Sequence, residues 1–277
     1  MEWPLAFVLS WQPTRFEAAA AIEDLERMLE RLRALGYAGV ELAVRDPATV
    51  PVQRLRSLFG RYGLQVPAIG TGQAWVDEGL SLTHPDPAVR KAALARLEAH
   101  LELAAEWEAI VIVGLIRGRL MEGVNRAQAM DWLLEALARL AEPAAAQGVR
   151  LVLEPLNRSE TDLVNTVEEA LFLVNRVGYP NLGVLLDTFH ANLEEASLEA
   201  AIARAGDRLF HVHIADSNRQ APGWGQLDFA SVLKALREVN YRGWLSAEVV
   251  PHPSLEEAQV QVARWAHCLR SARGLPS

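Results

Sequence analysis

Four segments of the chain share one pattern: LVLEPLNR at residues 151–158, VLLDTFH at 184–190, FHVHIAD at 210–216 and LSAEVV at 245–250. Each is a short, mostly apolar run that carries an ionisable residue at or near its end. Nearly continuous apolar runs of this length are typical of parallel strands that are buried on both faces. We therefore expect four parallel strands in the second half of the chain.

The same kind of run occurs in the first half, so that eight strands are expected in all. They cover residues 5–10, 39–44, 65–70, 109–115, 150–156, 182–187, 208–215 and 244–250. Longer amphipathic segments follow them and predict helices at residues 18–35, 50–62, 87–107, 125–147, 166–177, 197–205, 229–239 and 254–270. Four of these helices should end at a glycine, namely Gly36, Gly63, Gly148 and Gly178. Asp228 and Ser254 are suited to cap the starts of two helices.

Eight strand–helix units without a linker predict an α/β fold, the (β/α)8 TIM barrel, as a single domain over residues 1–277. An open doubly wound sheet is the alternative. Such a sheet usually carries a glycine-rich phosphate loop after its first strand, whereas SWQPT follows here at residues 10–14. The longest stretch without a predicted helix, residues 71–86, follows the third strand and is expected to be a lid or active-site loop.

Composition excludes several classes of protein. The chain has 27 Lys and Arg against 35 Asp and Glu, a net charge of −8, which argues against gripping nucleic acid by charge. Hydrophobic residues make up 51%, as in globular proteins rather than disordered ones. We see neither a signal peptide at the N-terminus nor an apolar run long enough for a membrane span. A single cysteine, Cys268, cannot form an intrachain disulfide, which agrees with a cytoplasmic location.

Each of the four C-terminal strands places one ionisable residue near its end: Glu154, Asp187, His213 and Glu248. They are spaced 33, 26 and 35 residues apart, close to one strand–helix unit each, so a barrel would bring them to the same mouth. An ion pair with a loop arginine is the alternative for any single carboxylate. Three carboxylates together repel one another unless a cation neutralises them, and with one imidazole they suit Mn²⁺, Mg²⁺ or Co²⁺. We read His211, which points the same way but deeper, as core or as support for the site rather than as a ligand.

Three motifs carry a resemblance to a known family: EPLNRSE at residues 154–160, LDTFHANLEE at 186–195 and HVHIADSNR at 211–219. In this order they resemble the xylose-isomerase-like TIM-barrel superfamily, most closely its D-tagatose 3-epimerase and D-psicose 3-epimerase branch. The resemblance covers the whole chain in layout and is strongest over residues 145–250.

The resemblance implies a metal-dependent sugar epimerase that inverts C3 of a free ketose through an enediolate. One divalent ion, typically Mn²⁺ with Mg²⁺, Co²⁺ or Zn²⁺ as alternatives, would be bound by Glu154, Asp187, His213 and Glu248. The two glutamates would also be the catalytic acid and base. Glu160, His190 and Arg219 would bind the sugar. The family is commonly dimeric or tetrameric, so a homo-oligomer with a small-molecule sugar substrate is expected.

Other functions stay open at this point. An aldose–ketose isomerase of the hydroxypyruvate type or an inosose-type dehydratase would use the same ligands. An endonuclease IV-like DNA repair enzyme needs extra histidines, which are absent from AIGTG at 68–72 and VGLIR at 113–117. A sugar-binding protein without catalysis would not need the complete set. In the first half, Trp11, Glu41 and Trp75 are candidate sugar contacts, with packing as the alternative for each.

Overall fold

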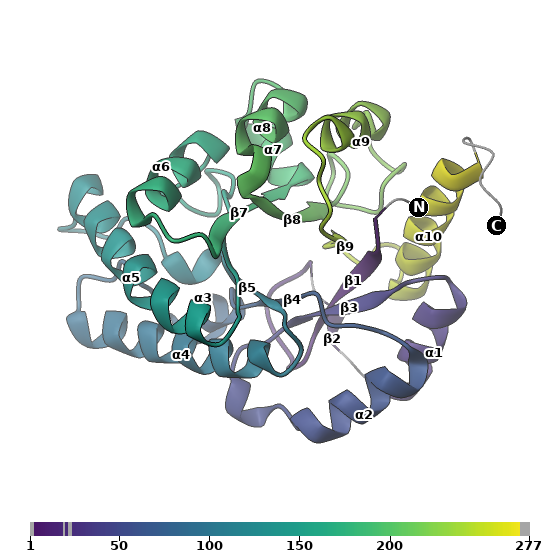
Figure 1. Cartoon of the computed structure of the whole chain (residues 1–277), viewed down its shortest axis with the longest axis horizontal. Coiled ribbons are helices and arrows are strands. Elements are labelled where there is room, and N and C mark those ends of the chain that lie inside the picture. The colour runs from purple at the N-terminus through teal and green to yellow at the C-terminus, as the bar shows by residue number, and fades with distance from the viewer. Residues whose placement is uncertain (1–2, 19, 22–23, 272–277) are drawn as a thin grey trace.

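A computed structural model describes residues 3–18, 20–21 and 24–271. Eight parallel strands form a closed ring at the centre of the molecule (Figure 1). They are β1 (Leu5–Ser10), β3 (Gly39–Ala43), β4 (Ala68–Gly70), β5 (Ile110–Val113), β6 (Leu151–Leu153), β7 (Leu182–Asp187), β8 (Leu209–Ile214) and β9 (Leu245–Ala247). The ring closes because β1 pairs with β3 on one side and with β9 on the other. The predicted TIM barrel is confirmed.

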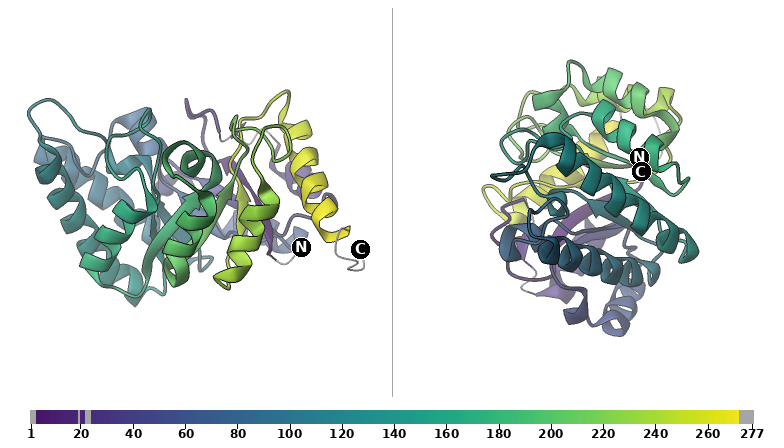
Figure 2. Two further views of the ribbon diagram at one scale, coloured as in Figure 1. Left: turned by 90° about the horizontal axis from the view of Figure 1, so that it is seen from above. Right: turned by 90° about the vertical axis from the view of Figure 1, so that its left-hand side faces the viewer.

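Eight helices follow the strands and form the outer layer (Figure 2). They are α1 (Leu25–Ala34), α2 (Val52–Tyr62), α4 (Pro87–Ala105), α5 (Arg126–Ala146), α6 (Val167–Val177), α8 (Leu198–Ala205), α9 (Phe229–Glu238) and α10 (Leu255–Ser271). Most lie within two residues of their predicted ranges. Gly63 and Gly178 end their helices with φ of 61° and 75°, the left-handed region that glycine adopts without strain. Asp228 and Ser254 accept backbone hydrogen bonds at the starts of α9 and α10, as predicted.

The prediction of a helix over residues 18–35 is wrong in its first part. Ala20–Ala21 form a two-residue strand, β2, which pairs with Leu9 and Ser10 of β1. The helix begins only at Leu25, because the carboxylate of Asp24 accepts the backbone N–H of Arg27 and caps it there. Residues 19, 22 and 23 of the predicted helix lie outside the described residues.

Two short helices near the mouth of the barrel were not predicted. The stretch 71–86, read from the sequence as non-helical, contains α3 (Gln73–Glu78), which ends at Gly79 with φ of 72°. The second, α7 (Thr188–Glu194), follows β7 directly. Asp187 caps it by accepting the backbone N–H of Phe189 at 2.7 Å. Both helices are only two turns or less, too short to show a helical period in the sequence.

The alternation of side chains along each strand determines which residues face the interior of the barrel. Ile112, Val152 and Leu185 belong to a small apolar cluster of the interior, while their chain neighbours pack in the large cluster beneath the helices. Glu154 stands two residues beyond Val152 and therefore points to the same interior, at the end of β6. The alternation thus delivers a carboxylate to the C-terminal mouth of the barrel.

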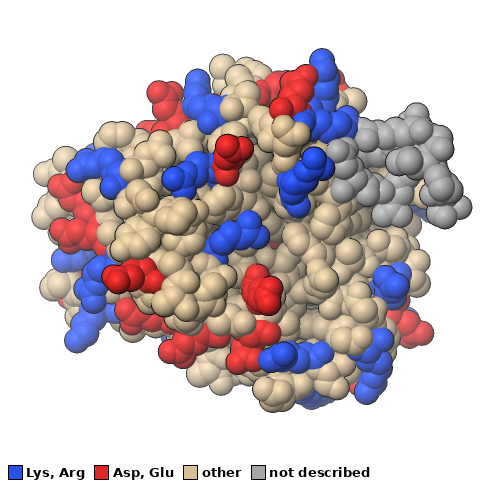
Figure 3. Space-filling model, viewed as in Figure 1, with Lys and Arg blue, Asp and Glu red and all other residues tan. Residues whose placement is uncertain are grey.

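The molecular surface carries both signs of charge. On the face seen in Figure 3, acidic and basic side chains are interspersed, and the basic ones form no continuous patch in the described part of that face. This distribution agrees with the net charge of −8 and gives no support to nucleic-acid binding. Among the described residues, the structure also has no helix that is long and apolar enough to cross a membrane.

Candidate active site

The four ionisable residues of the C-terminal strands converge at the mouth of the barrel. Glu154 follows β6, Asp187 ends β7, His213 lies in β8 and Glu248 follows β9. The Nδ1 atom of His213 lies 3.6 Å from Glu154 Oε1 and 3.9 Å from both Asp187 Oδ2 and Glu248 Oε2. One ligand-type atom from each of the four residues lies within 4.8 Å of all the others. The structure therefore brings together the residues that the spacing predicted would meet.

The hydrogen bonding of this group fits a divalent cation. Glu154 Oε1, Asp187 Oδ2 and His213 Nδ1 are buried and have no hydrogen-bond partner among the described residues. Buried polar atoms are rarely left unpaired, so three such atoms facing one point indicate a missing partner. Three carboxylates and one imidazole form a hard, oxygen-rich donor set that suits Mn²⁺, Mg²⁺ or Co²⁺, and also Zn²⁺.

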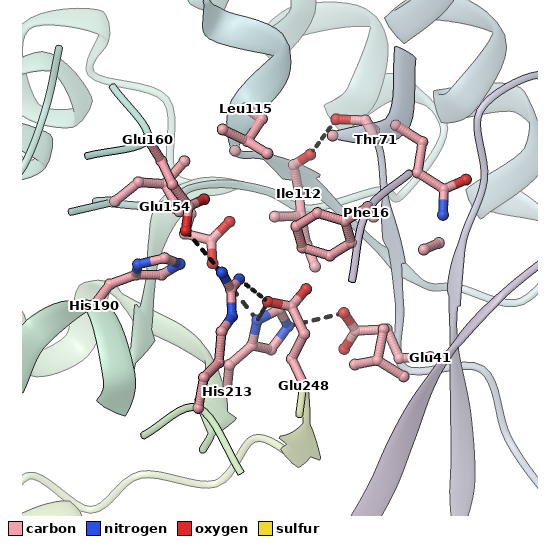
Figure 4. A pocket seen from close by; sticks show the side chains of 18 residues that line it. Phe16, Glu41, Thr71, Ile112, Leu115, Glu154, Glu160, His190, His213 and Glu248 are labelled. Atoms are coloured by element: carbon pink, nitrogen blue, oxygen red, sulfur yellow. Dashed lines mark hydrogen bonds and ion pairs between the residues drawn. The ribbon is translucent and has the colours of Figure 1, made fainter. Parts of the chain in front are cut away.

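His213 is oriented from behind by Glu41 on β3. Glu41 Oε1 lies 2.8 Å from His213 Nε2 (Figure 4). Its other oxygen lies 2.7 Å from His211 Nε2. When the Glu41 carboxylate accepts a hydrogen bond from Nε2–H of His213, the Nδ1 lone pair of His213 is directed at the three acidic residues. The sequence offered Glu41 as a sugar contact or a packing residue. Its bonds to both histidines make it a support for the candidate metal site, and it also lines the cavity described below. His211 lies in the core as predicted.

Burial and charge shift the protonation of this cluster. Burial raises the pKa of Asp187 to about 6 and that of Glu248 to about 8, although His213 and Arg219 oppose both shifts. Burial alone would lower the pKa of His213, but the facing carboxylates of Glu41 and Glu248 hold it well above its usual range. Burial would likewise raise the pKa of Glu41, but the two histidines hold it well below its usual range. The cluster thus retains protons near neutral pH that a divalent cation would displace.

The three residues assigned to the sugar lie beside this cluster. Arg219 donates to Glu160 Oε1 at 2.7 Å and to Glu248 Oε2 at 3.2 Å, with its guanidinium stacked near the rings of Phe16 and Phe189. Its backbone has φ of 58°, an unusual value for a residue with a side chain. The aromatic and acidic neighbours therefore hold the guanidinium of Arg219 at the edge of the site.

His190 is buried in α7 and presents one free nitrogen. Its Nδ1 lies 2.8 Å from Asn157 Nδ2, and its Nε2 has no hydrogen-bond partner among the described residues. Burial lowers the pKa of His190 well below its usual range, with the charge of Arg219 acting in the same direction, so the ring is neutral. Since Nδ1 accepts from the amide, Nε2 carries the proton and is available as a donor.

A cavity at the mouth of the barrel joins these groups (Figure 4). Its polar wall includes Glu41, Glu154, Glu160, His190, His213, Arg219 and Glu248, and its apolar wall includes Val8, Phe16, Ile112, Leu115 and Leu156. Trp11 is not part of this lining; its indole N–H points to the carbonyl oxygen of Thr49 at 3.4 Å. Trp75 lines an adjoining hollow outside the cavity. A concave apolar pocket with few converging polar groups is suited to a small polar substrate.

The fold and the cavity together define the class of protein. Residues 29–268 match the family model described as a xylose isomerase-like TIM barrel, and the chain belongs to this family. Similar curated relatives include ketose 3-epimerases. The chain is 34% identical over 236 residues to L-ribulose 3-epimerase of Mesorhizobium japonicum, covering 84% of this chain and 78% of that protein. It is 31% identical to ketose 3-epimerase of Arthrobacter globiformis, covering 80% and 76%.

Solved structures agree with this relationship. D-allulose 3-epimerase from Methylomonas sp., in complex with D-allulose, matches with a TM-score of 0.81 and 26% sequence identity. The match covers 98% of this chain and 97% of that chain. The likeness therefore extends over the whole barrel.

Proposed function

We propose that the chain is a divalent-metal-dependent epimerase that inverts C3 of a free ketose, the carbon next to its carbonyl. The observation that carries the proposal is the set of unpartnered, buried donor atoms of Glu154, Asp187 and His213, which lie together beside a cavity that Glu154 and His213 line. The identity of the ketose 3-epimerase relatives supports the same reaction.

Glu154, Asp187, His213 and Glu248 would hold the metal ion, with Mn²⁺ as our first choice and Mg²⁺, Co²⁺ or Zn²⁺ as alternatives. Bound there, the ion supplies Lewis acidity that polarises the substrate carbonyl and favours the enediolate. The protein contributes a fixed geometry, because Glu41 orients His213 and the backbone N–H of Phe189 fixes one oxygen of Asp187. A preorganised set of ligands needs little rearrangement when the ion binds.

Glu154 and Glu248 would be the catalytic base and acid, and they exchange roles with the direction of the reaction. They come from β6 and β9, which are separated by β7 and β8, so they reach the cavity from different sides. One carboxylate removes the proton from the substrate carbon, and the other returns a proton to the opposite face of the planar enediolate. In the site without an ion, burial raises the pKa of Glu248 to about 8, so this carboxyl group exchanges protons near neutral pH.

Arg219, Glu160 and His190 would position the sugar. The guanidinium of Arg219 offers donors to sugar oxygens, Glu160 offers an acceptor, and neutral His190 offers its Nε2 proton. Several hydrogen bonds to one substrate restrict it to the geometry in which the reacting carbon faces a carboxylate.

A panel of ketoses assayed with Mn²⁺ in D₂O tests the proposal. We expect a C3 epimer as the product, with one deuterium at C3 taken from the solvent. An aldose product would instead assign the chain to the aldose–ketose isomerases, and loss of water from the substrate would assign it to the dehydratases. Turnover that is unchanged after the metal is removed and the apo-protein is assayed with chelator would contradict the metal requirement.

A further inference from the structure

Arg117 is fully buried beside the candidate site, and every hydrogen bond that its guanidinium makes in the described structure goes to a backbone carbonyl oxygen. Nη1 donates to Glu154 at 2.6 Å and to Gly114 at 3.0 Å. Nε donates to Leu163 at 2.9 Å, and Nη2 donates to Val164 at 3.1 Å. The side chain has 0% exposure.

These four carbonyl groups belong to three segments that build the site. Gly114 follows β5, and Glu154 follows β6. Leu163 and Val164 lie at the far end of the loop that starts at Glu154 and also carries Glu160. Arg117 therefore ties both ends of this loop to each other and to the end of β5.

The segment that carries Arg117 also makes room for the Glu154 carboxylate. Residues 114–118, GLIRG, form a 3₁₀ turn in which the N–H of Arg117 donates to the carbonyl oxygen of Gly114. A Cβ atom at Gly114 would come within 2.4 Å of Glu154 Oε2, so any larger residue would displace the carboxylate. The 114–118 turn thus contacts Glu154 at both its carbonyl and its carboxyl group.

A buried guanidinium without an ion pair is costly, so its position calls for a reason. Among the described residues, no carboxylate oxygen lies within the 4.0 Å of an ion pair with Arg117. Burial lowers the pKa of Arg117 to about 10, while Glu154, Glu160 and Glu169 act against the fall, so the group stays charged at neutral pH. Hydrogen bonds from a charged donor are stronger than those from a neutral one, which suits a residue that must fix several carbonyl groups.

We propose that Arg117 is a positioning residue for Glu154, holding the backbone at the end of β6 so that the carboxylate faces the substrate carbon. The inference rests on the proposed acid–base role of Glu154. It extends that role to a residue that touches neither the substrate nor the metal position. Loss of Arg117 should therefore impair Glu154 selectively and leave Glu248 as it is.

The test compares Arg117→Met and Arg117→Lys with Arg208→Met as the matched control. Arg208 also donates to backbone carbonyl groups, those of Tyr179 and Leu182, but at the opposite end of β7 from the site. Each epimer of the substrate loses its proton to one glutamate and regains one from the other. With Glu154 impaired, the epimer deprotonated by Glu248 should exchange with D₂O more often than it converts.

We expect Arg117→Met to raise the ratio of exchange to conversion at least fivefold for one epimer, the same epimer that responds in Glu154→Gln. The other epimer should show no increase, and Arg208→Met should leave both ratios within twofold of the wild type. A general loosening of the fold would slow proton transfer by both glutamates, so it would not affect one epimer selectively. If Arg117→Met fails to fold, the same ratio is measured for Arg117→Lys, which keeps the charge but loses the planar guanidinium with its several N–H donors. Wild-type ratios in the folded variant overturn the proposal.

A second readout does not depend on turnover. Titration of the apo-protein with Mn²⁺ should show affinity at least fivefold weaker for Arg117→Lys and within twofold of the wild type for Arg208→Met. If the wild type converts no ketose, the proposed function fails and this titration alone decides the role of Arg117. Unchanged Mn²⁺ affinity in Arg117→Lys would then overturn it.

Discussion

Glu41→Gln is expected to weaken binding of a divalent ion although Glu41 is not one of the four proposed ligands. In the wild type, each oxygen of Glu41 faces an Nε2 atom, one of His211 and one of His213. A glutamine of the same shape offers one oxygen and one NH₂ group. The histidine that faces the NH₂ group must give up its Nε2 proton and carry it on Nδ1 instead.

Either arrangement of the glutamine is unfavourable for the ion. If His213 changes tautomer, its Nδ1 proton points at the three acidic residues and blocks the metal position. If His211 changes, it buries an N–H at Nδ1, where no partner exists among the described residues. A buried unsatisfied donor costs about 1–3 kcal/mol. Since binding requires the second arrangement, the dissociation constant for Mn²⁺ should rise by roughly 5- to 150-fold.

Calorimetric titration of the apo-proteins with Mn²⁺ measures this effect, and nitrogen NMR of the histidine rings reports the tautomers. His211→Gln is the control, because its amide keeps a donor for Glu41 and leaves the bond to His213 intact. We expect its affinity to stay within threefold of the wild type. A dissociation constant for Glu41→Gln within twofold of the wild type would refute the reasoning.

Three further predictions concern the site. Glu154→Gln and Glu248→Gln each keep a ligand oxygen but lose a proton carrier, so turnover should fall by about 10²–10⁴-fold even at Mn²⁺ concentrations that saturate the variant. Recovery of wild-type turnover on addition of Mn²⁺ would argue for a ligand role alone. Arg219→Ala should raise KM or lower turnover with metal content and melting temperature unchanged, and wild-type kinetics would return Arg219 to a structural role. Burial raises the pKa of Asp187 from 3.8 to about 6, so its contribution to apo-protein stability is full below 3.8 and is lost as the pH rises through 6. Apo Asp187→Asn should therefore melt at a higher temperature than the apo wild type at pH 7 but not at pH 3.5, and equal differences at both pH values would contradict this.

The barrel could be predicted from the sequence because its signals are local and repeated. Each buried strand is a short apolar run, and a glycine such as Gly63 or Gly178 marks the end of a helix before the next strand. The errors fall where local preference and tertiary pairing disagree. Ala20 and Ala21 have high helical propensity, yet they pair with β1. The helices α3 and α7 depend on single caps and turns rather than on periodic burial, so no apolar periodicity in the sequence predicts them.

The grouping of the four candidate ligands was predictable for a different reason. Each of four successive strands carries one ionisable residue at its end, and the ends of barrel strands meet at one mouth, so these residues must lie close together. The supports of the site gave no such signal. Glu41 lies 170 residues from His211 in the chain, and Arg117 reaches Glu154 and Val164 through backbone carbonyl groups that exist at every position. Contacts of that kind follow from how the loops close in space.

The charges of the site leave a group of unpaired acidic and imidazole atoms facing one another. Arg219 lies between Glu160 and Glu248, and His213 lies between Glu41 and the remaining acidic groups. Those contacts satisfy the outer oxygens and leave the unpaired atoms of Glu154, Asp187 and His213 directed inward. Three acidic side chains so close together would repel one another, so their shared position is stable only with protons or a cation between them. The raised pKa values of Asp187 and Glu248 show the protonated alternative. Binding of a divalent cation should therefore release protons, and its affinity should rise from pH 6 to pH 8.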